Sequence, residues 1–242
     1  KVVLTGECAD EVFGGYPWFH REEMLNSGTF PWTPSLTPRK VLLKDDLVKS
    51  LHMDEYVKKI YDRSVSEINV LPSENEIETN RRRIGYLNIR FFMQTLLNRM
   101  DRTSMFSGLE ARVPFADRKL VDYVFNIPWE MKAKDGLVKN ILRQASKGLL
   151  PDEILFRRKS PYPKTYNPYY ENLLAKRLKE VLSDSTSPLH SLLDLKQVTQ
   201  FLENPKDYGA PWYGQLMAGP QMIAYLLQIE YFLRKYNVSI RI

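Results

Sequence analysis

Three carboxylates near the N-terminus are the residues of this sequence best suited to chemistry. Glu7, Asp10 and Glu11 lie within five positions of one another, directly after the apolar run Val2–Leu4. Such a run predicts a short strand that is buried on both faces. In an open parallel sheet, ligands bind just beyond the carboxyl ends of the strands. Carboxylates beside a nucleotide indicate Mg²⁺, because this ion bridges carboxylate and phosphate oxygens.

Glycines on both sides of the acidic segment would give a ligand access to the backbone. Gly6 precedes the first carboxylate and lets the backbone come close to a ligand. Gly14 and Gly15 permit a positive φ and a sharp exit from the segment. The pattern alone leaves a second interpretation open, which is a strand followed by an acidic surface loop.

A basic loop is the second candidate for chemistry. Arg157, Arg158 and Lys159 are consecutive and precede Pro161, which stiffens the loop. Clustered arginine and lysine side chains suit phosphate or pyrophosphate. The alternative is an exposed basic loop without a ligand.

Four charged residues in the middle of the chain predict an internal charge network. Asp101, Arg102, Glu110 and Arg112 stand among apolar residues, and charges that are buried there must pair. We expect these four residues to be mainly structural.

Two other classes of site are not indicated. The densest basic run, Arg81–Arg83, has no regularly interleaved aromatic residues and predicts a solvated helix face rather than contact with nucleic acid. The histidines, His20, His52 and His190, lack the spacing of metal ligands.

The composition is that of a globular protein with one large domain or two small ones. The chain has 242 residues and a net charge of +6, which would suit an anionic ligand such as a nucleotide. No apolar run approaches the ~18 residues of a membrane span. The single cysteine excludes an internal disulfide and fits a cytoplasmic location.

Most of the remaining chain has helical periodicity. Helices are predicted over residues 42–68, 74–100, 169–203 and 221–237, the third with a break near its middle. Asp117 is a candidate cap for a further helix. No second convincing strand follows the first within a hundred residues. The first strand is therefore expected to join a sheet whose other strands precede residue 1.

Separate blocks of the sequence resemble the glutamine-hydrolysing asparagine synthetases, in the family's order. Residues 5–16, T-G-E-C-A-D-E-V-F-G-G-Y, resemble the family segment SGEG(S/A)DE(V/L)FGGY. Residues 97–117 resemble LxxxDRxSMxxGLEARVPFLD, residues 139–143 resemble KxxLR, and residues 150–159 resemble LPxxI followed by RxK. The departures are Thr5 for serine, Cys8 for glycine and Ala116 for leucine.

The resemblance implies an ATP-dependent ligase of asparagine biosynthesis. Such an enzyme activates the side-chain carboxylate of aspartate as β-aspartyl-AMP and releases pyrophosphate. Ammonia, supplied from glutamine by a glutaminase domain, then displaces AMP. The implied cofactors are ATP and Mg²⁺. The implied roles are backbone contacts to ATP for Thr5 and Gly6, action on the intermediate or on ammonia for Glu7, a Mg²⁺ ligand for Asp10 and leaving-phosphate contact for Lys159, with Glu11 and Arg158 as further candidates.

The resemblance also implies the fold and the partners. The chain should be mainly helical with one N-terminal parallel strand, as part of an α/β domain of the adenine-nucleotide α-hydrolase-like type, the PP-loop ATP pyrophosphatases. Residues 1–242 correspond to the C-terminal part of the synthetase domain, without the glutaminase domain and the SGGxDS pyrophosphate loop. This chain alone should therefore be inactive. A homodimer is compatible with the resemblance, and neither nucleic acid nor a membrane is an expected partner.

Two alternatives stay open from the sequence. One is a related adenylating enzyme that forms another amide bond, of the β-lactam synthetase or lasso-peptide cyclase type. The other is a helical binding module without catalytic activity.

Overall fold

The chain divides into two units, and each unit has its own hydrophobic core. The computed structural model describes residues 1–160, 167–205 and 219–240. The first unit contains residues 1–31 and 61–160, and the second contains residues 32–60 and 161–242. All candidate site residues predicted from the sequence lie in the first unit.

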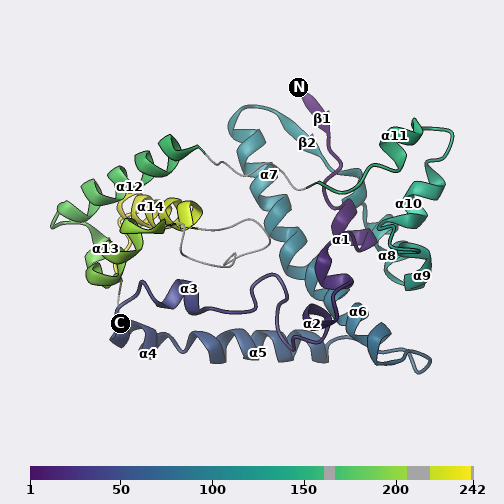
Figure 1. Ribbon diagram of the computed structural model, residues 1–242, viewed down its shortest axis with the longest axis horizontal. Helices are drawn as coiled ribbons and strands as arrows, with labels where there is room; N and C mark the ends of the chain where they lie inside the picture. The colour runs from purple at the N-terminus through teal and green to yellow at the C-terminus, as the bar shows by residue number, and fades with distance from the viewer. Residues whose placement is uncertain (161–166, 206–218, 241–242) are drawn as a thin grey trace. The chain divides into compact units, whose positions relative to one another are not determined.

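Two short strands form a parallel sheet in the first unit (Figure 1). β1 (Val2–Leu4) pairs with β2 (Glu110–Arg112). The pairing continues past β1, since the Thr5 amide donates to the carbonyl of Arg112 at 3.0 Å. β2 was not predicted from the sequence, because its residues, E-A-R, carry no apolar alternation.

The predicted burial of β1 is wrong for the described residues. Val2 is 50% exposed and Leu4 is 70% exposed. The reason is that a sheet of two strands covers neither face of β1, and no described helix packs over it enough to bury these side chains.

Helices make up most of the first unit. A continuous helical run begins at α6 (Glu76–Leu87), passes through a π-helical turn at Asn88–Met93 and continues as α7 (Gln94–Phe106). Asn75 and Glu78 form a capping box at its start, which explains why it begins two residues later than predicted. The other helices of this unit are α1 (Ala9–Phe13), η1 (Pro17–Phe19), α2 (Glu22–Leu25), η3 (Pro114–Ala116), α8 (Arg118–Phe125), α9 (Trp129–Lys132), α10 (Asn140–Ala145) and α11 (Asp152–Leu155).

The core of the first unit fixes α1 against the long helical run and α8. Cys8, Val12, Phe13, Met93 and Val124 are its buried members. The predicted cap of α8 is confirmed, since the Asp117 carboxylate accepts from the amides of residues 119 and 120 at 3.0 and 3.2 Å. This core therefore sets the position of α1, whose first turn carries two of the predicted carboxylates.

The second unit is helical in its described part. Its helices are α3 (Thr37–Lys40), α4 (Asp45–Leu51), the first part of α5 (Met53–Ser66), α12 (Pro168–Ser183), η4 (Pro188–Ser191), α13 (Leu195–Glu203) and α14 (Gly219–Lys235). α12 packs against α14 (Figure 1), around a core that includes Leu178 and Ile223. The single helix predicted over residues 42–68 is wrong, because His52 has a φ of 44° and separates α4 from α5. The stretch between the helices predicted over residues 169–203 and 221–237 lies mostly outside the described residues.

No helix in the described part of the chain has the length and apolar character needed to cross a membrane.

Candidate active site

The end of β1 leads directly into α1 through a tight turn. Cys8 has a φ of 70°, in the left-handed region that residues other than glycine seldom adopt. This conformation explains why the resembling family segment has glycine at the position. The turn brings Glu7 and Asp10 to the carboxyl end of the parallel strand, where a ligand is expected in such a sheet.

Gly15 is required by the position of the Asp10 carboxylate. A Cβ atom on Gly15 would lie 1.8 Å from Asp10 Oδ1, so any side chain would displace the carboxylate. The Gly15 amide donates to the Asp10 carbonyl at 2.8 Å, which closes α1. The Gly-Gly exit of the motif therefore makes room for the carboxylate beside it.

Two lysines from different segments converge on Asp10. Lys139 Nζ lies 2.9 Å from Asp10 Oδ1, and Lys159 Nζ lies 3.3 Å from the same oxygen. The three side chains are 20–27% exposed. This arrangement places two cations and one carboxylate next to each other at an accessible surface, where phosphate groups could replace the lysine–carboxylate contacts.

Lys159 is held from three sides. Its ammonium donates to the carbonyl of Gly15 at 3.1 Å and lies 3.9 Å from the centroid of the Tyr16 ring, besides pairing with Asp10. Burial lowers the pKa of Lys159, and the Asp10 carboxylate opposes that shift. The predicted phosphate-contact lysine thus lies next to the predicted metal ligand.

Arg143 holds the backbone of the loop that carries Lys159. Its guanidinium donates to the carbonyl of Val138 at 2.8 Å, to the carbonyl of Arg157 at 3.2 Å and to that of Leu155. Since Lys139 immediately precedes the same helix, α10 supports both lysines of the site. Lys139 itself has a φ of 57°, a strained conformation of the kind found at functional sites.

Glu11 and Tyr16 form a buried pair behind Lys159. The Tyr16 hydroxyl donates to Glu11 Oε1 at 2.5 Å, and the Tyr16 ring stacks on Trp18 with centroids 4.3 Å apart. Burial raises the pKa of Glu11, while the hydrogen bond from Tyr16 lowers it in part. Burial and the neighbouring Glu11 also raise the pKa of Tyr16, so Tyr16 remains a neutral donor.

Glu7 pairs with Arg99, a residue of α7 that the sequence analysis did not select. The Arg99 guanidinium contacts Glu7 Oε1. The second oxygen, Oε2, is buried and accepts no hydrogen bond from any described residue. A buried carboxylate oxygen without a donor suits a bound cation or a proton-donating ligand.

The remaining predicted residues are placed as follows. Thr5 Oγ1 accepts from the Glu7 amide at 3.3 Å, which tightens the turn. A Cβ atom on Gly6 would meet no atom of a described residue within 4 Å, so the space beside this backbone is open to a ligand. Arg158 is exposed and forms no hydrogen bond or ion pair with the described residues of the site, so the structure does not bring it to Asp10.

The predicted internal charge network is wrong. Asp101 and Arg102 are exposed, and only Glu110 and Arg112 pair, at 2.7 Å, with side chains that are more than half exposed. These charges lie on the surface because β2 and the end of α7 are not covered in the described part of the chain. Surface pairs of this kind contribute little to stability.

Three residues of the site were missed as functional candidates: Arg99, Lys139 and Arg143. A signal existed for two of them, because K-x-x-L-R places a lysine and an arginine four residues apart, on one face of a helix. Nothing in the local sequence of Arg99 relates it to Glu7, which lies 92 residues away.

Within residues 1–160, 167–205 and 219–240, no group of three histidine, cysteine, aspartate or glutamate side chains lies close enough together to bind a metal ion. The oxygen donors that are present, on Asp10 and Glu7, are those that Mg²⁺ prefers. They fit an ion whose other ligands come from a bound phosphate compound.

Comparison with known proteins gives consistent matches along the chain. The family model described as asparagine synthase matches residues 1–234. The glutamine-hydrolyzing asparagine synthetase 3 of Bacillus subtilis (strain 168) is 50% identical over 240 residues, which cover 99% of this chain and 39% of that protein. Asparagine synthetase 1 of the same organism is 28% identical over 236 residues, covering 84% of this chain and 36% of that protein.

A shorter match joins the chain to a mammalian protein. The glutamine-hydrolyzing asparagine synthetase of Rattus norvegicus is 45% identical over 67 residues, which cover 26% of this chain and 12% of that protein. The chain therefore spans less than two fifths of the length of these relatives.

Proposed function

The chain belongs to the asparagine synthase family, and we propose that the complete protein converts aspartate to asparagine with ATP. In this proposal the aspartate side-chain carboxylate attacks the α-phosphorus of ATP, which gives β-aspartyl-AMP and pyrophosphate. Ammonia, supplied from glutamine by a glutaminase domain, then attacks the acyl carbon, and AMP leaves with the bonding electrons.

The observation that carries the proposal is the convergence of Lys139 and Lys159 on Asp10. Two ammonium groups at one place can bind the phosphates of ATP and neutralise the charge that develops on the leaving pyrophosphate. Lys159 is the better placed for the transition state, because Gly15 and Tyr16 fix its ammonium. The open space beside Gly6 gives the nucleotide access to the backbone at the strand end.

Glu7 is the proposed proton acceptor for ammonia. An amine that attacks an acyl-adenylate must lose a proton, and a carboxylate within reach can take it. Arg99 fixes one oxygen of Glu7, while Oε2 is left without a donor among the described residues and can receive the proton. Arg99 thus orients the carboxylate.

Mg²⁺ is part of the same proposal. Asp10 would hold it together with the phosphates of ATP, and the ion would supply charge neutralisation during phosphoryl chemistry. We also propose that the chain is part of a PP-loop ATP pyrophosphatase domain, which agrees with a parallel strand that ends at the site.

The test uses the complete protein with ATP, Mg²⁺, aspartate and ammonia, and measures pyrophosphate and asparagine together. Equal amounts of both are expected. Pyrophosphate without asparagine would keep the adenylation and reject aspartate as the acceptor. The absence of both products would favour the interpretation as a helical binding module.

Two variants separate the steps. Glu7→Gln should abolish asparagine formation while ATP binding remains, and Lys159→Ala should slow ATP–pyrophosphate exchange. Glu23→Gln is the matched control, because Glu23 is exposed and lies outside the site. Unchanged turnover in Glu7→Gln would remove Glu7 from the mechanism, and normal exchange in Lys159→Ala would assign Lys159 to an ordinary surface loop.

A further inference from the structure

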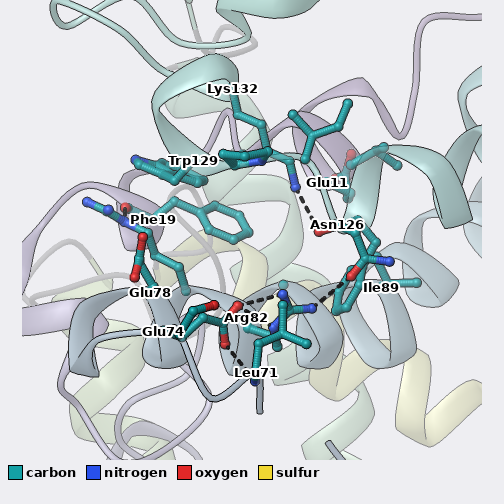
Figure 2. A pocket seen from close by; sticks show the side chains of 18 residues that line it. Glu11, Phe19, Leu71, Glu74, Glu78, Arg82, Ile89, Asn126, Trp129 and Lys132 are labelled. Atoms are coloured by element: carbon teal, nitrogen blue, oxygen red, sulfur yellow. Dashed lines mark hydrogen bonds and ion pairs between the residues drawn. The ribbon is translucent and has the colours of Figure 1, made fainter. Parts of the chain in front are cut away.

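A cavity in the first unit shares Glu11 with the candidate active site, but its described lining residues do not include Asp10, Lys139 or Lys159. It has a volume of about 210 Å³ and is lined by α1, α6 and the segment that joins α8 to α9. That volume corresponds to about seven water molecules in the liquid, enough for a small organic ligand. Lys132 and Arg82 reach toward this space from opposite sides, with Phe19 and Trp129 beside it (Figure 2).

Lys132 is a buried cation without a counter-ion among the described residues. Its residue is 9% exposed, and its ammonium donates to the carbonyl of Phe125 at 3.1 Å. Within the part of the chain that the structure describes, no carboxylate lies within ion-pair distance of this ammonium. Burying an unpaired charge costs several kcal/mol, and an anion in the cavity would offset that cost.

The carboxylates that line the cavity already have donors. Glu74 pairs with Arg82 at 2.5 Å, Glu78 accepts from the amide of Asn75 at 2.9 Å, and Glu11 accepts from Tyr16. Each of them is therefore engaged away from Lys132. Arg82 also donates to Asn126 at 3.0 Å, so its guanidinium is fixed facing the cavity.

The apolar side chains that line the cavity indicate what the rest of the ligand should be. The rings of Phe19, Phe125 and Trp129 and the side chain of Ile89 give the cavity an apolar side. On the same apolar side, the guanidinium carbon of Arg81 lies 4.7 Å from the centroid of the Trp129 ring. A ligand with one anionic end and a small apolar body matches both walls.

We propose that this cavity binds a small monocarboxylate, with its carboxylate on the Lys132 ammonium and its apolar body against Trp129 and Phe19. The site lies outside the proposed catalytic arrangement, and its occupation does not depend on ATP. Binding and synthesis can therefore be tested separately.

The pH dependence follows from the surroundings of Lys132. Burial, and secondarily the nearby Arg82, lower its pKa to about 8. The other charged groups facing it are Glu74 from the segment before α6, Glu78 and Arg81 from α6, and Glu11 from α1. His20, against the Trp129 ring, has a pKa lowered by burial and stays neutral above pH 7. A carboxylate binds the protonated ammonium, so affinity is present below pH 8 and is lost as the pH rises above it.

The experiment measures binding of propionate to the complete protein by saturation-transfer NMR, with propionamide as the neutral isostere. The wild type should bind propionate and not propionamide. Affinity for propionate should fall by about tenfold from pH 7 to pH 9. Lys132→Met should bind at least about tenfold more weakly at pH 7, because a hydrogen bond to a charged group is lost.

Lys134→Met is the matched control, since Lys134 is an exposed lysine two residues away. It should bind propionate like the wild type. Equal affinity in Lys132→Met, equal binding of propionamide, or no binding of propionate would each overturn the proposal. If Lys132→Met does not fold, the wild-type pH series decides, and a flat profile between pH 7 and pH 9 rejects the site.

Discussion

The Lys159 ammonium lies 3.9 Å from the centroid of the Tyr16 ring, and the same ring stacks on Trp18 while its hydroxyl donates to Glu11. The ring under the Lys159 ammonium is thus itself held in place by stacking on Trp18 and by the hydrogen bond to Glu11. A cation over a ring face is attracted by about 0.5–2 kcal/mol. Tyr16 therefore positions the ammonium: its ring contacts the cation directly, and its hydroxyl helps to hold the ring.

Replacing Tyr16 should separate these two contributions. Tyr16→Phe keeps the ring and should retain most of the ATP–pyrophosphate exchange activity. Tyr16→Leu removes the ring face and should slow exchange by about 3- to 30-fold, the equivalent of the lost cation–π attraction. The measurement is the exchange rate at saturating ATP in the complete protein. Equal rates in the two variants would mean that Tyr16 only packs.

Arg143 should be needed for the loop rather than for the chemistry. Arg143→Met leaves the carbonyls of Val138, Leu155 and Arg157 without their donor, which should lower the free energy of unfolding by about 1–3 kcal/mol. Because this loop carries Lys159, ATP–pyrophosphate exchange should slow as well. Urea unfolding and exchange are measured on the same preparations. Arg118→Met, at a 93% exposed side chain, is the control and should change neither. An unchanged unfolding midpoint in Arg143→Met would contradict the structure of this loop.

Lys139 combines a strained backbone with a side chain that is proposed to bind phosphate, and two substitutions distinguish these two properties. Lys139→Ala and Lys139→Gly should slow exchange alike, because both remove the ammonium from Asp10. Lys139→Gly should be the more stable of the two by about 1 kcal/mol, because its φ of 57° costs a residue with a Cβ atom 1–2 kcal/mol. The readouts are exchange and urea unfolding, with the exposed Lys147→Ala as control. If the alanine variant were clearly more stable, the left-handed conformation would be in doubt.

The sequence predicted those parts of the site that are local in the chain. The order strand, glycine, carboxylates, Gly-Gly lies within one stretch, so the placement of Glu7 and Asp10 after β1 could be predicted. The contacts of Arg99 and Lys139 with these carboxylates could not, because they depend on how α7 and the start of α10 pack against α1. Periodicity identifies which face of a helix is apolar, and it does not specify the partner of a polar side chain.

The errors in the predicted fold have the same origin, because they too concern features that the local sequence does not mark. β2 is three residues long and was not predicted, and the exposure of Leu4 reflects a sheet that has two strands in the described part of the chain. The helix break at His52 has no glycine or proline to mark it, so the pattern there looked continuous. Where side-chain chemistry decides the structure locally, as in the cap by Asp117, the prediction was confirmed.

Cys8 should be chemically inert in the folded protein. It is 1% exposed, and burial, with the nearby Glu11 and Glu7, raises its pKa to about 12. At pH 8 a disulfide reagent such as DTNB should find no reactive thiol in the native protein and one after denaturation. Cys8→Gly should be at least as stable as Cys8→Ala, because the φ of 70° favours glycine. Rapid native labelling would show that the turn opens, and a clearly more stable alanine variant would contradict the left-handed conformation.

Glu11→Gln should make the protein's stability less dependent on pH. Burial raises the folded-state pKa of Glu11 above 4.5, so the folded state favours the neutral carboxyl. The stabilisation from this shift is fully present below the unfolded-state pKa and is lost as the pH rises through the raised folded-state pKa. Glutamine has no such loss, and its side-chain carbonyl can still accept from Tyr16. Between pH 5 and pH 8, the variant should therefore gain stability relative to the wild type as the pH rises.

Urea unfolding of the two proteins at several pH values tests this expectation. Glu23→Gln, at an exposed glutamate, is the control and should follow the wild type throughout. If Glu11→Gln instead lost stability relative to the wild type at high pH, the ionised carboxylate would be stabilised in the folded state. The hydrogen bond from Tyr16 and the Lys159 ammonium would then be the cause, because both oppose the rise in the Glu11 pKa. That result would contradict burial as the dominant influence on the Glu11 carboxyl group.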